Sequence, residues 1–197
     1  MRIIGLTGPS GAGKSHVGEY FKSIGIPVIN ADEVYHGLLV PPSLCLDALC
    51  DAFGKEILTE SGELSRRKLA ELVFGNKEKL ELLNRTVLGF VLDKIREMIA
   101  DLEKNGKTAV IVDAPTLIES GFHKECHTVI SVLCPADIRI KRIMTRDSLD
   151  VSAAEARTKA QKPDEFYITQ SDEIIINDQG KAELLAKAEA LAKKLSL

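Results

Sequence analysis

The stretch GPSGAGKS, residues 8–15, constrains this chain more than any other part of its sequence. It follows the short apolar run RIIGL and Thr7, and it precedes a segment with apolar residues at helical spacing. Gly8, Gly13, Lys14 and Ser15 fit the pattern G-x-x-x-x-G-K-[ST], in which a glycine-rich loop joins a strand to a helix. The motif therefore predicts an α/β fold that starts with this unit.

The loop also predicts a site for a nucleoside triphosphate. Glycines let the chain fold back, so that backbone N–H groups and the helix start converge on phosphate oxygens. Lys14 is expected to reach the β- and γ-phosphates, and the Ser15 hydroxyl to ligate Mg²⁺. A glycine-rich turn that binds nothing is disfavoured, because the motif stands between a strand and a helix. The expected nucleotide-binding residues are Gly8, Pro9, Ser10, Gly11, Ala12, Gly13, Lys14, Ser15 and His16.

Short apolar runs alternate with longer amphipathic segments along the chain, which is typical of βα units around a parallel sheet. The runs are rich in Ile and Val, as expected for strands that are covered on both faces. We predict five strands, at Ile3–Leu6, Pro27–Asn30, Ala109–Asp113, Val129–Leu133 and Ile174–Ile176.

Helices are predicted between the strands, and one connection is unusually long. The helical segments outside that connection are Lys14–Ile24, a helix opened by a capping box from Ser152 to Glu155, and Lys181–Leu195. About 80 residues separate the second and third strands, far more than a simple crossover needs. They are predicted to form helices around Leu44–Phe53, Arg66–Phe74 and Asn76–Leu102. We expect a substrate site where this insertion meets the core.

Charge and cysteine content exclude several classes of protein. The formal net charge is −3, which disfavours binding to duplex DNA or to an anionic membrane. The four cysteines form no CxxC pair, so free thiols in a reducing compartment are expected. No segment has the length of a signal peptide's apolar run or a membrane span, so a cytoplasmic protein is expected, as a monomer or weak homo-oligomer.

Two aspartates follow predicted strands. Asp32 comes directly after the second strand, and Asp113 ends the third. Because carboxyl ends of parallel strands face the ligand crevice, Asp32 is a candidate to orient a hydroxyl, accept its proton or hold Mg²⁺ through water. Asp113 is a candidate Walker-B carboxylate or substrate-facing acid. The alternatives are that Asp32 only caps the following helix and that Asp113 is a turn residue.

Three arginines recur at helical spacing in DIRIKRIMTRD, residues 137–147. Arg139, Arg142 and Arg146 share one face of the predicted helix, with the apolar side chains expected opposite. Guanidinium groups can clamp a phosphoryl group or stack on adenine. The alternative is a solvated basic face.

The glycine-rich loop alone leaves an ATPase, a GTPase, a kinase and a switch open. The base-reading motif N/T-K-x-D of GTPases is absent from the sequence. A resemblance adds to this reading, because several segments along nearly the whole chain resemble the dephospho-coenzyme A kinases, within the P-loop nucleoside and nucleotide kinases. These segments are IGLTGPSGAGKS, GIPVINADEV, GELSRRKLAELVF, LEKNGKTAVIVDAPTLIESG, RIMTRDSLDVSAAEARTKAQKP and SDEIIINDQG.

The resemblance implies transfer of the γ-phosphoryl of ATP, with Mg²⁺, to the ribose 3′-hydroxyl of dephospho-CoA. Asp32 matches the family's catalytic acidic residue, which activates that hydroxyl, and Arg142 and Arg146 fall where the family has lid and nucleotide contacts. The implied fold is a five-stranded parallel core flanked by helices, with a helical substrate-binding insertion and a lid. We assign residues 1–35, 107–145 and 172–197 to the nucleotide-binding core, 36–106 to the acceptor-binding insertion and 146–171 to the lid.

The sequence departs from the family pattern at two places. Leu88-Gly89 stands where the family usually has His-Pro, and Asn30 replaces an acidic residue after the second strand. The first departure leaves another small-molecule kinase, acting on a nucleoside or nucleotide, as an alternative. A non-catalytic ATP-binding switch is the second alternative.

Overall fold

The computed structural model describes residues 1–73 and 75–197, which form two compact units. The first unit comprises Met1–Ile29 and Leu102–Leu197, and the second comprises Asn30–Asp101. Each unit is described by itself below.

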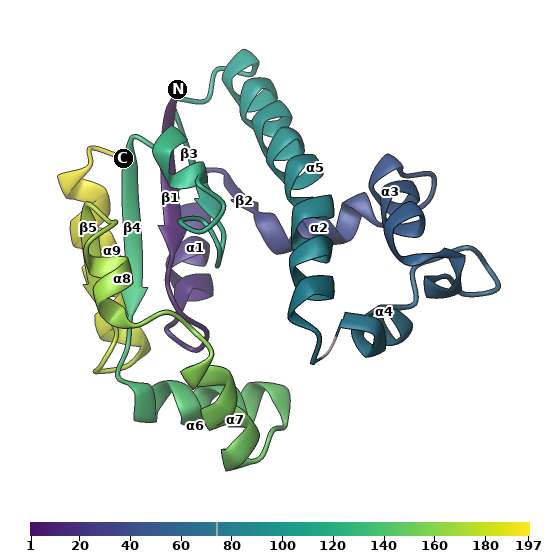
Figure 1. The fold of residues 1–197 in the computed structure, drawn as a ribbon. Coiled ribbons are helices and arrows are strands. Elements are labelled where there is room, and N and C mark those ends of the chain that lie inside the picture. Colours follow the sequence, from purple (N-terminus) through teal and green to yellow (C-terminus); the bar gives the residue numbers. More distant parts are fainter. Residues whose placement is uncertain (74) are drawn as a thin grey trace. The chain divides into compact units, whose positions relative to one another are not determined.

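A five-stranded sheet carries the nucleotide-binding motif, and Figure 1 shows its strands as arrows. The strand order is β2-β3-β1-β4-β5, so the strand before the glycine-rich loop, β1, is central. Pairing is parallel between β1 and both of its neighbours, and between β4 and β5. The bounds are β1 Arg2–Thr7, β2 Val28–Asn30, β3 Ala109–Asp113, β4 Thr128–Leu133 and β5 Glu173–Ile176. The predicted parallel α/β sheet is confirmed, with each strand within about two residues of its expected bounds.

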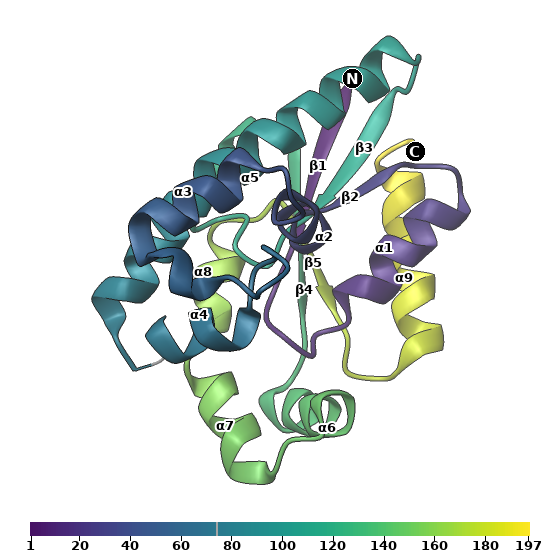
Figure 2. The same cartoon turned by 90° about the vertical axis from the view of Figure 1, so that its right-hand side faces the viewer.

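Helices cover both faces of the sheet, which explains why its strands are mostly apolar. Helices α1 (Lys14–Ser23) and α9 (Lys181–Lys194) lie side by side, as Figure 2 shows. Phe21 and Leu184 from these helices pack with Ile4 and Val132 in the main core. A second cluster joins Leu133 to Tyr167 of α8 (Asp164–Ile168). Neighbouring residues of β4 thus enter different clusters, as the alternation of a strand requires.

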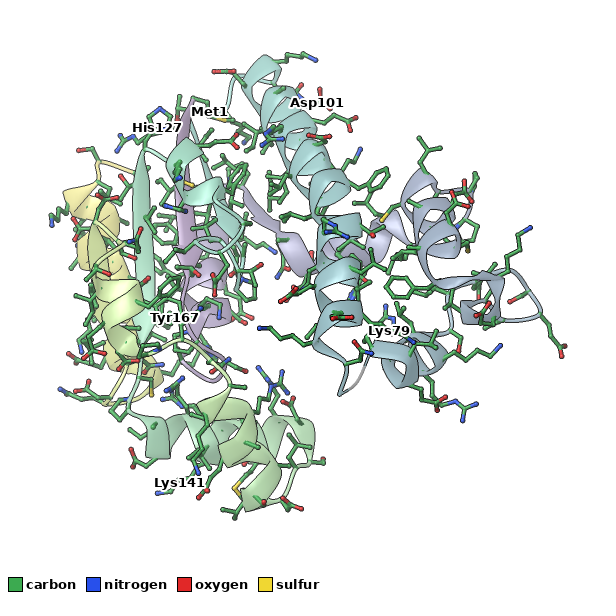
Figure 3. The ribbon with its side chains drawn as sticks, viewed as in Figure 1. Met1, Lys79, Asp101, His127, Lys141 and Tyr167 are labelled. Atoms are coloured by element: carbon green, nitrogen blue, oxygen red, sulfur yellow. The ribbon has the colours of Figure 1, made fainter. Side chains whose placement is uncertain are left out.

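The two chain ends lie near each other at the amino end of β1 (Figure 1). Arg2 donates a hydrogen bond from its guanidinium to the carbonyl of Leu195. His127, labelled beside Met1 in Figure 3, accepts the Ile3 N–H at 3.1 Å from its Nδ1 atom. These contacts secure the end of the sheet opposite the glycine-rich loop.

The second unit is helical. Its elements are α2 (Ala31–Leu38), α3 (Leu44–Phe53), η1 (Lys55–Ile57), α4 (Arg66–Val73) and most of α5 (Lys77–Lys104), whose last residues belong to the first unit. Leu49 and Ile57, both fully buried, anchor a core of its own. The predicted helical insertion is present; the expected end of its second helix, at Phe74, lies outside the described residues.

Two predictions about local structure were wrong or incomplete. The helix α7 (Val151–Lys159) is capped by Asp150, whose carboxylate accepts the Ala153 N–H at 2.8 Å, and not by Ser152. Asp and Ser are comparable caps, so the pattern alone did not separate two neighbouring starts. The five-residue helix α8 was not predicted, because one turn is too short to show a periodic pattern.

No helix of the described residues is long and apolar enough to cross a bilayer.

Candidate functional site

The glycine-rich loop adopts a backbone that its glycines make possible. Gly8, Gly11 and Gly13 have φ angles of 132°, 79° and 107°, in the region that side chains disfavour. A Cβ atom on Gly8 would lie 2.2 Å from the carbonyl oxygen of Val132 in β4. The loop therefore needs glycine at this position both for its φ angle and for its close approach to the sheet.

Replacing Gly8 by alanine is expected to lower the free energy of unfolding by about 2–5 kcal/mol, from the φ strain and the clash together. The matched control is Gly25→Ala, because Gly25 has a φ of 88° but open space around its Cβ position. It should cost only about 1–2 kcal/mol. Denaturant unfolding of the two variants checks this, and equal losses would show that the contact with Val132 is unimportant.

The start of α1 is open to an anion. Gly13 is its N-cap, no side chain of the described residues caps it, and its first turn holds no acidic residue. The first N–H groups of a helix lack intrahelical partners and carry partial positive charge. Ser15 is exposed in this first turn, and His16 follows it, half-buried. This arrangement suits phosphate oxygens.

Lys14 lies across the loop that precedes it. Its Nζ atom is 2.7 Å from the carbonyl oxygen of Gly8 and 3.4 Å from that of Pro9. The ammonium group is thus held within the glycine-rich loop by these two carbonyl groups. The structure thus places one cation within the loop, and contact of Lys14 with phosphates stays a prediction.

Arg142 and Asn177 both contact carbonyl groups of the glycine-rich loop. Arg142, on helix α6 (Ala136–Asp147), points Nη1 at the carbonyl of Gly11 at 3.2 Å. Asn177 is buried and donates from Nδ2 to the carbonyl of Ala12 at 2.6 Å. Because the Ala12 carbonyl is engaged by Asn177, the Gly13 N–H of the same trans peptide points the opposite way. Arg142 thus contacts the loop rather than solvent.

Asn177 was missed as a functional residue. It follows β5 directly, in the segment SDEIIINDQG, and a polar residue at the carboxyl end of a parallel strand was the available signal. A Cβ on Gly13 would lie only 2.4 Å from its Nδ2 atom, so the amide and the loop are closely packed.

The arginine face of α6 is buried at Arg139 and half-buried at Arg142, whereas Arg146 is exposed. Arg139 is 7% exposed, and its Nη1 donates to Oε1 of Gln161 at 3.2 Å. Ile143, one turn later, is fully buried as well. The expected separation of arginines from apolar residues is therefore wrong, because this face of α6 packs against the protein and carries both kinds of residue.

Arg146, at the end of α6, contacts both the loop and a carboxylate. Its Nη2 atom lies 3.1 Å from Oγ of Ser10, and its Nε and Nη2 each lie 2.8 Å from an oxygen of Asp147. Arg157 adds a third contact to that carboxylate at 2.6 Å. Hydrogen bonding from Arg146, aided by the charges of both arginines, lowers the pKa of Asp147, which keeps the cluster ionised. The same hydrogen bond raises the pKa of Arg146.

The two predicted aspartates belong to different units. Asp113 ends β3 in the first unit, is 7% exposed and pairs with Leu6 in the strand register. Asp32 is exposed in the first turn of α2, in the second unit. The N-cap of that helix is Asn30, whose Oδ1 accepts the N–H groups of Asp32 and Glu33 at 2.9 and 3.1 Å. The alternative that Asp32 caps the helix is therefore wrong, and its carboxylate makes no hydrogen bond to any described residue.

The cysteines are free thiols, as predicted, with Cys45 and Cys134 buried. Burial raises the pKa of Cys126 to about 12, with smaller contributions from Glu125 and Asp172, so this thiol is a poor nucleophile. In the described part of the chain, no three His, Cys, Asp or Glu side chains gather as a metal site.

Comparisons with known proteins agree with this geometry. A sequence model described as dephospho-CoA kinase matches residues 2–183. A dephospho-CoA kinase of Carboxydothermus hydrogenoformans is 36% identical, over 93% of this chain and 88% of that protein. A relative from Arabidopsis thaliana with the same name is also 36% identical, over 90% of this chain and 77% of its own length.

Solved structures share the fold. TT1252 from Thermus thermophilus superposes with a TM-score of 0.83 at 31% identity, over 98% of this chain and 97% of that one. Dephospho-CoA kinase from Campylobacter jejuni has a TM-score of 0.74 at 30% identity, covering 100% and 98%. A shikimate kinase from Acinetobacter baumannii, at 21% identity and a TM-score of 0.57, shares the fold alone. The family match and these relatives show that the chain belongs to the dephospho-CoA kinase family.

Proposed function

We propose that this protein transfers the γ-phosphoryl group of ATP to the ribose 3′-hydroxyl of dephospho-CoA, giving coenzyme A and ADP. The observation that carries the proposal is the family match over residues 2–183, which includes the glycine-rich loop and the segments beyond it. The loop alone supports only phosphate binding, since many kinases share it. The segments after the loop are what favour this acceptor over another.

The residues of the loop fit a triphosphate with Mg²⁺. A Cβ on Gly8 or Gly13 would clash with Val132 or Asn177, so only glycine fits there, and a loop of this kind offers backbone N–H groups to phosphate. The exposed hydroxyl of Ser15, together with Asp32 partly through water, would hold the metal ion. When bound, Mg²⁺ neutralises phosphate charge.

Three cations of this chain are proposed to act on the phosphates. Lys14 would exchange its carbonyl contacts in the loop for the β- and γ-phosphate oxygens. Arg146 already touches Ser10 of the loop and is placed to bind the transferring group. Arg142, which holds the Gly11 carbonyl, is proposed to keep the loop in shape and to face the nucleotide. Fixed charges of this kind stabilise the charge of phosphoryl transfer without having to reorganise.

Asp32 is proposed to orient the acceptor hydroxyl and accept its proton. The Asp32 carboxylate suits this role because it is exposed and makes no hydrogen bond to the described residues. Asp113 is proposed to contact the acceptor. Residues 36–106 are assigned to acceptor binding and 146–171 to a lid that excludes water, which would otherwise hydrolyse ATP.

The test is ADP release measured with and without dephospho-CoA. We expect release to depend on dephospho-CoA and the product to carry one added phosphate, located on the 3′-oxygen by phosphorus NMR. Nucleosides and nucleoside monophosphates serve as competing acceptors, since Leu88-Gly89 departs from the usual family pattern. Faster transfer to any of them would replace the proposed acceptor, and ATP binding without acceptor-dependent release would indicate a switch.

A further inference from the structure

We propose that Asp147 is a positioning residue that holds Arg146 and Arg157 together beside the glycine-rich loop, and that Arg157 is a further arginine for the phosphates of the nucleotide. The inference rests on the proposed function, because it assigns new roles at the ATP site. The glycine-rich loop motif alone predicts no role for Asp147 or Arg157.

The contacts converge on one carboxylate. Arg146 binds Asp147 with two nitrogens, each at 2.8 Å, in the paired geometry that a guanidinium and a carboxylate favour. Arg157 binds the same Oδ2 atom that Arg146 Nη2 contacts, at 2.6 Å. Because the two nitrogens share an oxygen, the two guanidinium groups are neighbours.

Local structure explains how residues ten positions apart in the chain meet. Helix α6 ends at Asp147, Ser148 turns the chain with a φ of 53°, and Asp150 caps α7. The two helices pack against each other, so the last turn of α7 returns to the end of α6. Lys141, on α6, is labelled on the outer side of this helix pair in Figure 3. The helix pair is thus a support for Arg157.

The charge of the cluster favours an anion. Two guanidinium groups share one carboxylate, which leaves a net positive charge next to Ser10 of the loop. The Asp147 side chain is 24% exposed and the arginines are 55% and 48% exposed, so these ion pairs add little to the stability of the fold. Their geometry is therefore better explained by what they position than by what they stabilise.

Arg157 has donors to offer. Of its nitrogens, only Nη1 is hydrogen bonded to a described residue, and a guanidinium has five N–H groups. Without Asp147, two like charges at this distance would move apart, and Arg157 would lose its orientation. With Asp147 in place, the guanidinium group of Arg157 is oriented to donate to phosphate oxygens, a pairing that arginine favours.

The test uses a double-mutant cycle with Asp147→Asn and Arg157→Gln, and ATP affinity measured by calorimetry with Mg²⁺. Each single variant is expected to weaken ATP binding by about tenfold, the value of a charged hydrogen bond. If Asp147 acts through Arg157, the double variant will lose clearly less than the product of the two single losses. In steady state, kcat should fall while the KM for dephospho-CoA stays unchanged.

The matched control is Glu155→Gln, which removes a 3.5 Å ion pair with Lys159 on the same helix, α7. It should change neither ATP affinity nor kcat. Strictly multiplicative losses, or single variants that lower only the unfolding midpoint, would overturn the inference. ATP binding needs no acceptor, so these results stand apart from the proposed function, which fails if the unaltered protein does not phosphorylate dephospho-CoA.

Discussion

Lys14→Ala is expected to lose about 10²–10³-fold in phosphoryl transfer, the cost of removing one fixed positive group from such a transition state. The ammonium group is held in the loop by the carbonyls of Gly8 and Pro9, so it is present where phosphates are proposed to bind. No other residue of the segment 8–15 is a lysine or an arginine. The measurement is single-turnover transfer with saturating dephospho-CoA.

The control for this variant is Lys22→Ala, a lysine in the last turn of the same helix, α1. It removes an equal charge from the far end of the helix and should leave the rate unchanged. Near-normal transfer by Lys14→Ala, with its circular dichroism unaltered, would contradict the assignment of the phosphate site.

Asp32→Asn is expected to reduce kcat by about 10²–10⁴-fold, the usual contribution of a positioned general base. The amide keeps the size of the side chain but cannot accept the proton of the acceptor hydroxyl. ATP affinity should be retained, because the phosphate contacts proposed above come from the loop and α6. The measurement combines kcat with dephospho-CoA and calorimetric ATP binding.

Its control is Glu33→Gln, which changes an adjacent exposed carboxylate in the same helical turn. Both residues donate their N–H groups to Asn30, so both variants keep the helix cap intact. If Asp32→Asn lost ATP binding and kept its rate, Asp32 would act only through the metal ion or the nucleotide and would not be the base.

The order of strands and helices along the chain was predictable from sequence because buried parallel strands are short, apolar and bounded by turn residues. The whole of β3, Ala109–Asp113, is buried and was predicted without error. The α7 start was misplaced because Asp150 and Ser152 are both good caps. The direction of Arg139 was also missed, since spacing shows which residues share a face and not what that face packs against.

The candidate site was predictable only in part. The loop residues follow a local pattern, so they were found together. Asn177 and Arg157 lie far from the loop in sequence and reach it, or its neighbours, only after the chain has folded. Asn30 illustrates the reverse case: it departs from the family pattern, yet it is the N-cap of α2, a role for which asparagine and aspartate are equally suited.

The hydrogen bond from the buried Asn177 amide to the Ala12 carbonyl has a consequence for nucleotide specificity. A cradle built from main-chain atoms and braced from inside the protein needs little ordering when its ligand arrives, so the binding free energy is not spent on shaping it. Every triphosphate offers the same oxygens to such a cradle. Preference for one base over another must therefore come from outside the loop.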